Sequence, residues 1–216
     1  MMLKNLAATV AVICAAAVAM TTVADTEDKK PAGPAKIGQP APVFTLVDVD
    51  GKTHNLADYK GKIVVLEWFN AGCPWSGKES GNSVHATGRV KKLIADAKTA
   101  KVEVVYLLVD SSANRDKATV VKENKAARAK FGIKQPILID HDGKVGRVYG
   151  ARTTPHMYVI DAKGVLQYNG AFGDRKAKPD GSEQNFVLAA IKNLKDGKPV
   201  TPAQTRPWGC GVKYAR

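Results

Sequence analysis

Cysteine is scarce in this chain of 216 residues, which has three, Cys14, Cys73 and Cys210. So few cysteines, placed so far apart, exclude a small scaffold stapled by several disulfides. The four histidines have no close spacing, with one another or with Cys73, of the kind that holds a metal ion. We therefore expect no bound metal and no cofactor.

Acidic residues are outnumbered, 20 against 33 lysines and arginines, which gives a formal net charge of +13. Aromatic residues make up only 6% of the chain and do not alternate with the basic ones, as a surface that stacks nucleic-acid bases would require. We therefore expect no nucleic-acid partner. A basic surface instead favours docking to an acidic redox partner or peripheral association with an anionic membrane.

Charge is almost absent from the N-terminus, where Lys4 is the only charged residue in the first 24 positions. An apolar stretch rich in alanine and valine covers residues 6–20, and small residues of the kind that signal peptidase cuts follow it. This pattern predicts a signal peptide over residues 1–24 and export to the periplasm or the medium, with loss of Cys14. An uncleaved membrane anchor is the alternative, because the stretch is nearly long enough to span a bilayer.

The rest of the chain is typical of one domain between two tails. Residues 25–36 contain lysine, proline and glycine and are predicted to be a flexible spacer. Residues 37–196 are predicted to fold as the domain. Residues 197–216 are interrupted by proline and glycine, show no helical period and carry Cys210.

Within the domain, apolar patterns alternate between the periods of strands and helices. We expect strands at residues 44–47, 53–55, 63–69, 102–109, 157–160 and 165–168, and helices at residues 74–99, 116–130 and 183–195. The apolar segments 137–139 and 145–149 are expected to flank a turn. The last helix is predicted to share one face among Phe186, Ala189, Ala190 and Leu194. This alternation predicts an α/β fold with a mixed central sheet flanked by helices.

Cys73 is the most informative residue, because an apolar run at residues 63–66 leads into the corner formed by Gly72, Cys73 and Pro74. A polar stretch that can start a helix follows. At the end of a strand and the start of a helix, the helix dipole and unpaired N–H groups favour the thiolate over the thiol. Since only the thiolate is nucleophilic, Cys73 is predicted to be reactive. A buried, inert cysteine is the alternative.

The order of these elements resembles the thioredoxin fold, with an N-terminal hairpin extension and a C-terminal tail. More narrowly, the chain resembles the redoxin branch, which comprises the alkyl hydroperoxide reductase C/thiol-specific antioxidant (AhpC/TSA) and TlpA-like proteins, and within it a peroxiredoxin-like group. The resemblance runs from residue 37 to residue 214 and rests on residues 38–46, 51–62, 67–70, 80–82, 149–151, 153–157 and 208–214. It implies a thiol-dependent oxidoreductase.

The resemblance makes Cys73 the attacking thiol. Thioredoxin-like reductases have a second cysteine three positions later, where this chain has Ser76, so a disulfide within this motif cannot form. Cys73 must therefore form a sulfenic acid with a peroxide, or a mixed disulfide with a substrate, and be rescued by another thiol. Cys210 is the candidate resolving thiol, and an external thiol or a thioredoxin-like electron donor is the other. A permanent structural disulfide or a link between subunits are alternatives for Cys210.

The resemblance also implies roles for neighbouring residues. Peroxiredoxins carry a threonine or serine where this chain has Asn70, so a departing hydroxide would be stabilised by Asn70, by Arg152 or by backbone N–H groups. Thr154 and Pro155 resemble the loop that faces the active cysteine with a cis peptide bond and exposes the backbone of Thr154 to a substrate chain.

Four further residues complete the predicted site. Pro74 shapes the corner, and Trp75 either packs on the domain, as Trp208 is expected to do, or lines the substrate approach. Ser76 either donates a hydrogen bond to the thiolate or starts a helix. His156 is a candidate proton donor or acceptor.

Three hypotheses for function follow from these residues. The first is reduction of peroxides, with Cys73 as the nucleophile and Cys210 as the resolving thiol. The second keeps the nucleophile but makes the substrate a protein disulfide, for instance during cytochrome or metalloprotein maturation. The third is a binding or stress-response module with this fold and no turnover.

Overall fold

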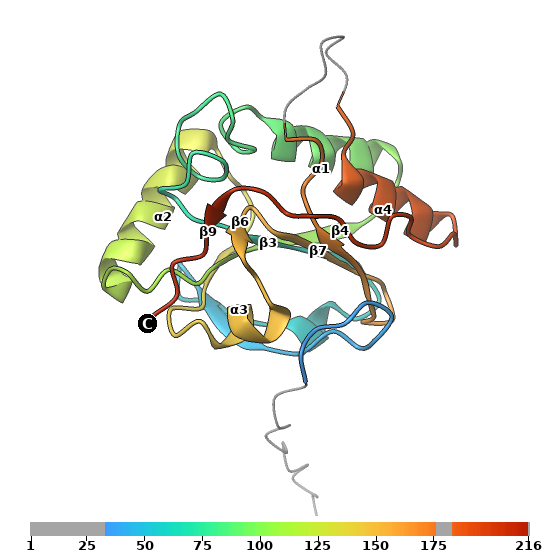
Figure 1. Cartoon of the computed structure of the whole chain (residues 1–216), viewed down its shortest axis with the longest axis horizontal. Helices are drawn as coiled ribbons and strands as arrows, with labels where there is room; N and C mark the ends of the chain where they lie inside the picture. Colours follow the sequence, from blue (N-terminus) through green and yellow to red (C-terminus); the bar gives the residue numbers. More distant parts are fainter. Residues whose placement is uncertain (1–32, 176–182, 216) are drawn as a thin grey trace, which may run out of the picture. The chain divides into compact units, whose positions relative to one another are not determined.

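The computed structural model describes residues 33–175 and 183–215. The predicted signal peptide and most of the predicted spacer lie outside these residues. A seven-stranded sheet with the order β2-β1-β5-β4-β3-β7-β8 forms the centre (Figure 1). Its strands are β1 (Thr45–Asp48), β2 (Thr53–Asn55), β3 (Ile63–Trp68), β4 (Val104–Asp110), β5 (Ile137–Ile139), β7 (Met157–Ile160) and β8 (Leu166–Gly170). A second, two-stranded sheet pairs β6 (Thr153–Thr154) with β9 (Cys210–Gly211).

The predicted mixed sheet and thioredoxin-like architecture are confirmed. Strand β3 pairs in parallel with β4, and β4 with β5, whereas the other pairs of the large sheet are antiparallel. All six residues of β3 are buried, because helices cover both faces of the sheet at this strand. The N-terminal hairpin β1–β2 turns at Asp50 and Gly51, as their sequence predicts.

The helices lie in two layers (Figure 1). On one face α1 (Arg89–Thr99), α2 (Lys117–Phe131) and α4 (Phe186–Lys195) contribute buried side chains to one core cluster. On the other face α3 (Lys144–Tyr149) and the short 3-10 helix η1 (Leu56–Tyr59) contribute to a second cluster. None of the helices within residues 33–175 and 183–215 combines the length and the apolar character that crossing a bilayer requires.

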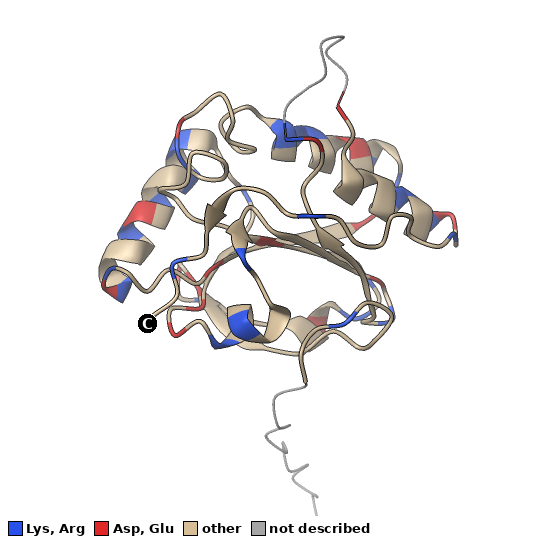
Figure 2. Ribbon diagram, viewed as in Figure 1, with Lys and Arg blue, Asp and Glu red and all other residues tan. Residues whose placement is uncertain are grey.

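The sequence predicts the bounds of α2 closely, because a capping residue stands at each end of the helix. The side chain of Asp116 accepts a hydrogen bond from the N–H of Thr119 at 2.9 Å and caps the start. Gly132 ends the helix in the left-handed conformation, with φ of 58°. Lysines and arginines lie along α1, α2 and α4, and α1 and α2 also carry acidic residues, so the basic character is spread over several helices (Figure 2).

The helix predicted over residues 74–99 is wrong in its first half, because α1 begins only at Arg89. Residues 74–88 form a succession of turns instead. Serine side chains bond to nearby backbone groups there, as when Ser83 Oγ accepts the N–H of Ala86 at 3.1 Å. Gly77 lies so close to Phe69 that a Cβ would come within 2.6 Å of its ring. Glycines and competing serines therefore prevent the helix.

Two smaller corrections concern α3 and α4. The segment 145–149 after the predicted turn is helical, between the left-handed Gly143 and Gly150. In α4 the fully buried residues are Val187, Ala190 and Ile191, whereas Phe186 and Leu194 are partly buried. The fully buried residues of α4 therefore differ from the predicted ones, and only Ala190 belongs to both sets.

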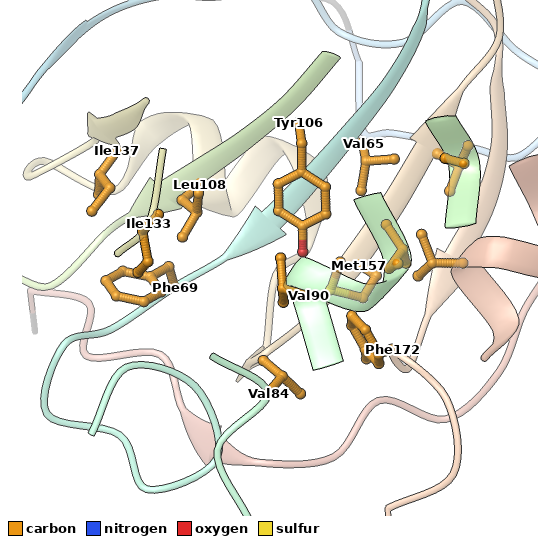
Figure 3. Packing of buried hydrophobic residues seen from close by; sticks show 14 of the residues in the cluster. Val65, Phe69, Val84, Val90, Tyr106, Leu108, Ile133, Ile137, Met157 and Phe172 are labelled. Atoms are coloured by element: carbon orange, nitrogen blue, oxygen red, sulfur yellow. The ribbon is translucent and has the colours of Figure 1, made fainter. Parts of the chain in front are cut away.

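The core beneath the turns explains how a segment without regular structure holds its shape. Figure 3 shows Val84, from this segment, in the cluster that contains Phe69, Val90 and Tyr106. Val84 and Phe69 are fully buried. Phe69, before the segment, and Val84, within it, thus anchor this part of the chain to the core. Cys73, the candidate nucleophile, lies between Phe69 and the segment.

Candidate redox site

Cys73 lies in a tight turn at the C-terminal end of β3. Its N–H donates to the carbonyl of Asn70 at 3.1 Å, and the N–H of Gly72 donates to Asn70 Oδ1 at 2.8 Å. The carbonyl of Cys73 in turn accepts the N–H groups of Ser76 at 3.0 Å and Lys78 at 2.9 Å. The thiol is held rigidly by this turn, and the residue is only 2% exposed.

Two backbone groups contact the Cys73 sulfur. The thiol donates to the carbonyl of Thr154 at 3.0 Å, and the N–H of Trp75 donates to Sγ at 3.4 Å. Pro74 has no N–H, so Trp75 supplies the first donor after the thiol. Because α1 begins at Arg89, the predicted help from a helix N-terminus is wrong, and the Trp75 N–H takes its place.

The predicted cis peptide bond between Thr154 and Pro155 is present. Thr154 belongs to β6, which pairs antiparallel with β9, so that Thr154 faces Cys210 and Thr153 faces Gly211. This pairing brings the C-terminal tail beside Thr154, the hydrogen-bond partner of Cys73, and β6 and β9 lie side by side in Figure 1. The backbone of Thr154, predicted to be open to a substrate, is therefore paired with the chain itself.

Cys210 is paired with Thr154, whose carbonyl accepts the Cys73 thiol, so the two free thiols are neighbours. Burial, together with the neighbouring Cys73, raises the pKa of the Cys210 thiol to about 11. At neutral pH Cys210 is therefore a protonated thiol beside the candidate nucleophile, Cys73. It can donate a hydrogen bond to a Cys73 thiolate or meet a Cys73 sulfenic acid without a large movement.

Two tryptophans pack together beside the thiols. The ring centroids of Trp75 and Trp208 are 5.7 Å apart in an edge-to-face arrangement. Trp208 Nε1 donates to the carbonyl of Gly173 at 2.8 Å, and its ring packs against the core, as predicted. The guanidinium of Arg175 lies 4.2 Å from the centroid of Trp75.

Asn70 and Ser76 point their polar groups away from the thiol. Asn70 Nδ2 donates to Ser112 Oγ at 2.6 Å, while its oxygen holds the turn at Gly72. Ser76 Oγ donates to Glu67 Oε1 at 3.1 Å rather than to the Cys73 sulfur. Both side chains therefore shape the turn that carries the thiol.

His156 and Arg152 support β6 rather than facing the thiol. His156 Nδ1 accepts the backbone N–H of Arg152 at 3.2 Å, and its Nε2 donates to Asn169 Oδ1 at 2.7 Å. Burial lowers the pKa of His156 to about 4, so the ring is neutral at pH 7. Arg152 has an exposed side chain, and its backbone carbonyl accepts the N–H of Val212 in the tail at 3.1 Å.

The structure adds a buried polar cluster that sequence reasoning did not assign. Glu67, in β3, is fully buried and accepts hydrogen bonds from Ser76, from Tyr106 Oη at 2.6 Å and from His85 Nε2 at 3.0 Å. A glutamate in the otherwise apolar run 63–68 is the signal that could have revealed it, because a buried carboxylate needs partners.

Known proteins resemble this chain at the level of family and fold. The family model described as the AhpC/TSA family matches residues 37–169. A thioredoxin-like protein of Bacillus subtilis, YneN, is 32% identical over 130 residues, which are 60% of this chain and 68% of that protein. The thiol-disulfide oxidoreductase ResA of Bacillus thuringiensis is 28% identical over 60% of this chain and 66% of its own length.

A chloroplastic peroxiredoxin Q of Triticum aestivum is 31% identical over 61% of this chain, which spans 57% of that protein. Among solved structures, a hypothetical protein of Sinorhizobium meliloti is similar in fold, with a TM-score of 0.69, 22% identity and coverage of 87% of this chain and 99% of that one. A redox activity at a thiol or disulfide is what the names of the peroxiredoxin and ResA relatives share.

Proposed function

Because the chain belongs to the AhpC/TSA family, we propose that it is an exported thiol-dependent peroxidase in which Cys73 attacks a hydroperoxide and Cys210 resolves the product. The observation that carries the proposal is the position of Cys210, which the pairing of β9 with β6 places opposite Thr154, the residue whose carbonyl accepts the Cys73 thiol. Export rests on the sequence of residues 1–24.

The first step oxidises Cys73. Its thiolate attacks one oxygen of the hydroperoxide, so that an S–O bond forms while the O–O bond breaks. The departing oxygen takes a proton and leaves as water or an alcohol, and Cys73 is left as a sulfenic acid. The N–H of Trp75 supports the negative charge on sulfur before the attack.

The second step uses Cys210. Its sulfur loses a proton and attacks the sulfur of the sulfenic acid, so that an S–S bond forms and the S–O bond breaks. The hydroxide combines with the proton and leaves as water. An external dithiol, or a thioredoxin-like donor, then reduces the disulfide by two electrons and restores both thiols.

Intact-mass analysis tests this proposal. Reduced mature protein treated with one equivalent of hydrogen peroxide should rapidly lose two hydrogens, and peptide mapping should place the new link between Cys73 and Cys210. The variant Cys210→Ser should instead gain one oxygen at Cys73, trapped by dimedone, and Cys73→Ser should form neither product. A Cys73 thiol that stays reduced for many minutes would sink the peroxidase proposal.

Exchange with protein disulfides is the second candidate. The pairing of β6 with the tail, beside the cis Thr154–Pro155 bond, favours it, because a strand that pairs with one extended chain next to Cys73 can pair with an extended substrate chain in its place. If this protein reduces a protein disulfide stoichiometrically but does not react with peroxide, that result would select this candidate over the first.

A further inference from the structure

We propose that the tail strand, residues 208–214, determines which oxidants react at Cys73, because it occupies the strand edge on which a protein disulfide would have to pair. With the tail strand seated, small hydroperoxides react and polypeptide disulfides do not. This inference rests on the proposed function, since it names the substrate class of the same site.

The tail strand is seated where a second chain would pair. Thr154 faces Cys210 and Thr153 faces Gly211 in the antiparallel register, which places a cysteine of the paired strand next to Cys73. If the tail strand lifted, the N–H and C=O groups of β6 would form an open edge beside the nucleophile. An extended peptide in the register of Cys210 would then present its own cysteine sulfur to Cys73.

The fit is close enough to leave no space for both chains. Gly209 has φ of +132°, and a Cβ built on it would come within 2.2 Å of the carbonyl oxygen of Thr154. That oxygen is the one that accepts the Cys73 thiol. The backbone of the tail strand therefore lies directly against the group that orients the nucleophile.

Tyr214, at the far end of the tail strand, packs into a site that two glycines leave open. Tyr214 lies against Gly143 and Gly146, where a Cβ would come within 2.6 Å of the ring and 2.4 Å of its hydroxyl. Its hydroxyl donates to the carbonyl of Ala151 at 2.9 Å, and the guanidinium of Arg147 lies 4.7 Å from the ring centroid. Two glycines of α3 and its N-cap thus leave room for this tyrosine.

Trp208 fixes the other end through Gly173 and the ring of Trp75. Between the two aromatic anchors, backbone bonds to Arg152 and Ala113 complete the attachment. All residues from Trp208 to Tyr214 are half-buried or exposed. An opening of this strand exposes little core, and so it can occur without unfolding of the domain.

The chemistry with a polypeptide disulfide requires such an opening. The Cys73 thiolate would attack one sulfur of the substrate, forming a mixed disulfide as the substrate S–S bond breaks and its second sulfur leaves as a thiolate. Cys210 would then attack the Cys73 sulfur, which forms the Cys73–Cys210 disulfide and releases the reduced substrate. A hydroperoxide delivers one oxygen and needs no strand edge.

The test compares variants of the full chain in two assays. In the first, Trp208→Ala, Tyr214→Ala and the double variant are assayed for reduction of insulin with dithiothreitol as donor, and for the rate at which hydrogen peroxide oxidises Cys73, a step that does not use Cys210. If the tail strand opens more often, insulin reduction should rise by about tenfold or more, while the peroxide rate should change by less than about threefold. Phe131→Ala, an aromatic truncation at the end of α2, is the matched control and should leave insulin reduction unchanged.

The second assay does not depend on turnover. In a Cys210→Ser background, labelling of Cys73 by iodoacetamide and by a maleimide on a long polyethylene glycol chain is followed by peptide mass spectrometry. The tail variants should accelerate the bulky reagent by about tenfold and the small one far less. Gly209→Ala, which pushes the backbone away from Thr154 and keeps both anchors, should give the same preference if an anchor variant fails to fold.

Equal labelling by the bulky reagent in the parent and in every tail variant would overturn the inference. If labelling follows the expected pattern but peroxide leaves Cys73 reduced, the peroxidase proposal falls and the tail strand stands as a cover for a disulfide-exchange site. If peroxide reacts and the tail variants change neither insulin reduction nor labelling, the proposed function stands and this inference falls.

Discussion

The two sides of Cys73 are held by different kinds of contact. On one side, the turn that carries Cys73 is joined through Ser76 to the floor, which we define as the buried polar cluster of Glu67, Ser76, His85 and Tyr106, in which every residue is no more than 5% exposed. On the other side, the cover is the tail strand, residues 208–214, which lies at the surface and is attached by one short strand pair and two aromatic anchors. Changes in the floor should therefore alter stability, and changes in the cover should alter access to the thiol.

This difference has a physical cause. A donor in the floor that loses its acceptor cannot turn to water, so the full cost of leaving it unpaired is retained. A backbone group in the cover that loses its partner is exposed on opening and is hydrated instead. The same number of hydrogen bonds therefore contributes more to stability in the floor than in the cover.

The largest effect should follow from breaking the floor with Glu67→Ala. Removing the carboxylate leaves Ser76, His85 and Tyr106 without their buried acceptor, and we expect the free energy of unfolding to fall by about 3–5 kcal/mol. Urea unfolding followed by circular dichroism measures this loss. The matched control is Glu79→Ala, which removes a glutamate paired with Lys130 at the surface and should cost less than about 1 kcal/mol. Similar losses in both variants would contradict the claim that burial makes the hydrogen bonds of the floor more stabilising than a pair at the surface.

A smaller effect should appear on acidification, through the residue that supports β6. Burial lowers the pKa of His156 from 6.5 to about 4, so the folded protein holds this ring neutral where the unfolded chain protonates it. The resulting stability is fully present above pH 6.5 and should be lost as pH falls from 6.5 to about 4, by an amount on the order of 3 kcal/mol.

Urea midpoints across this pH range check the expectation. His156→Gln, less stable at pH 7, should lose most of the slope, because the group that titrates is gone. The half-buried His141, in the turn before α3, provides the control, and His141→Gln should keep the slope of the parent. If the stability of the parent protein stays level between pH 6.5 and 4, His156 is protonated in the folded protein at little cost in free energy, which would contradict this prediction.

The sequence predicts the parts of the molecule in which local pattern and tertiary packing agree. The apolar run of β3, the Asp50–Gly51 turn and the Asp116 cap of α2 each specify their own element. The thioredoxin-like arrangement and the cis bond before Pro155 follow from resemblance rather than from local pattern. Cys73 and Thr154 come together as that resemblance implies.

The parts that the sequence does not predict depend on contacts between distant residues. The floor joins Glu67 to His85 and Tyr106, which come from the turns and from β4, and nothing in their local patterns marks them as partners. The tail strand pairs over only two residues with β6, too few for a period to be visible. The turns at residues 74–88 replace a helix because serine side chains compete for backbone groups.

The smallest effect should follow from Arg152→Gln, which changes the side chain of this residue and leaves its backbone contacts in place. The backbone N–H supports His156 and the carbonyl holds Val212 of the cover, while the side chain is exposed. Gln keeps the backbone contacts. An oxyanion donor acts only from contact distance, and the side chain of Arg152 is exposed, so the rate of Cys73 oxidation by peroxide should change by less than about twofold. Stopped-flow tryptophan fluorescence can follow this rate, since Trp75 and Trp208 lie beside the thiols. A loss of about a hundredfold would instead assign the guanidinium to the departing hydroxide and would place a second charged group, beyond the backbone donors, at the boundary between floor and cover.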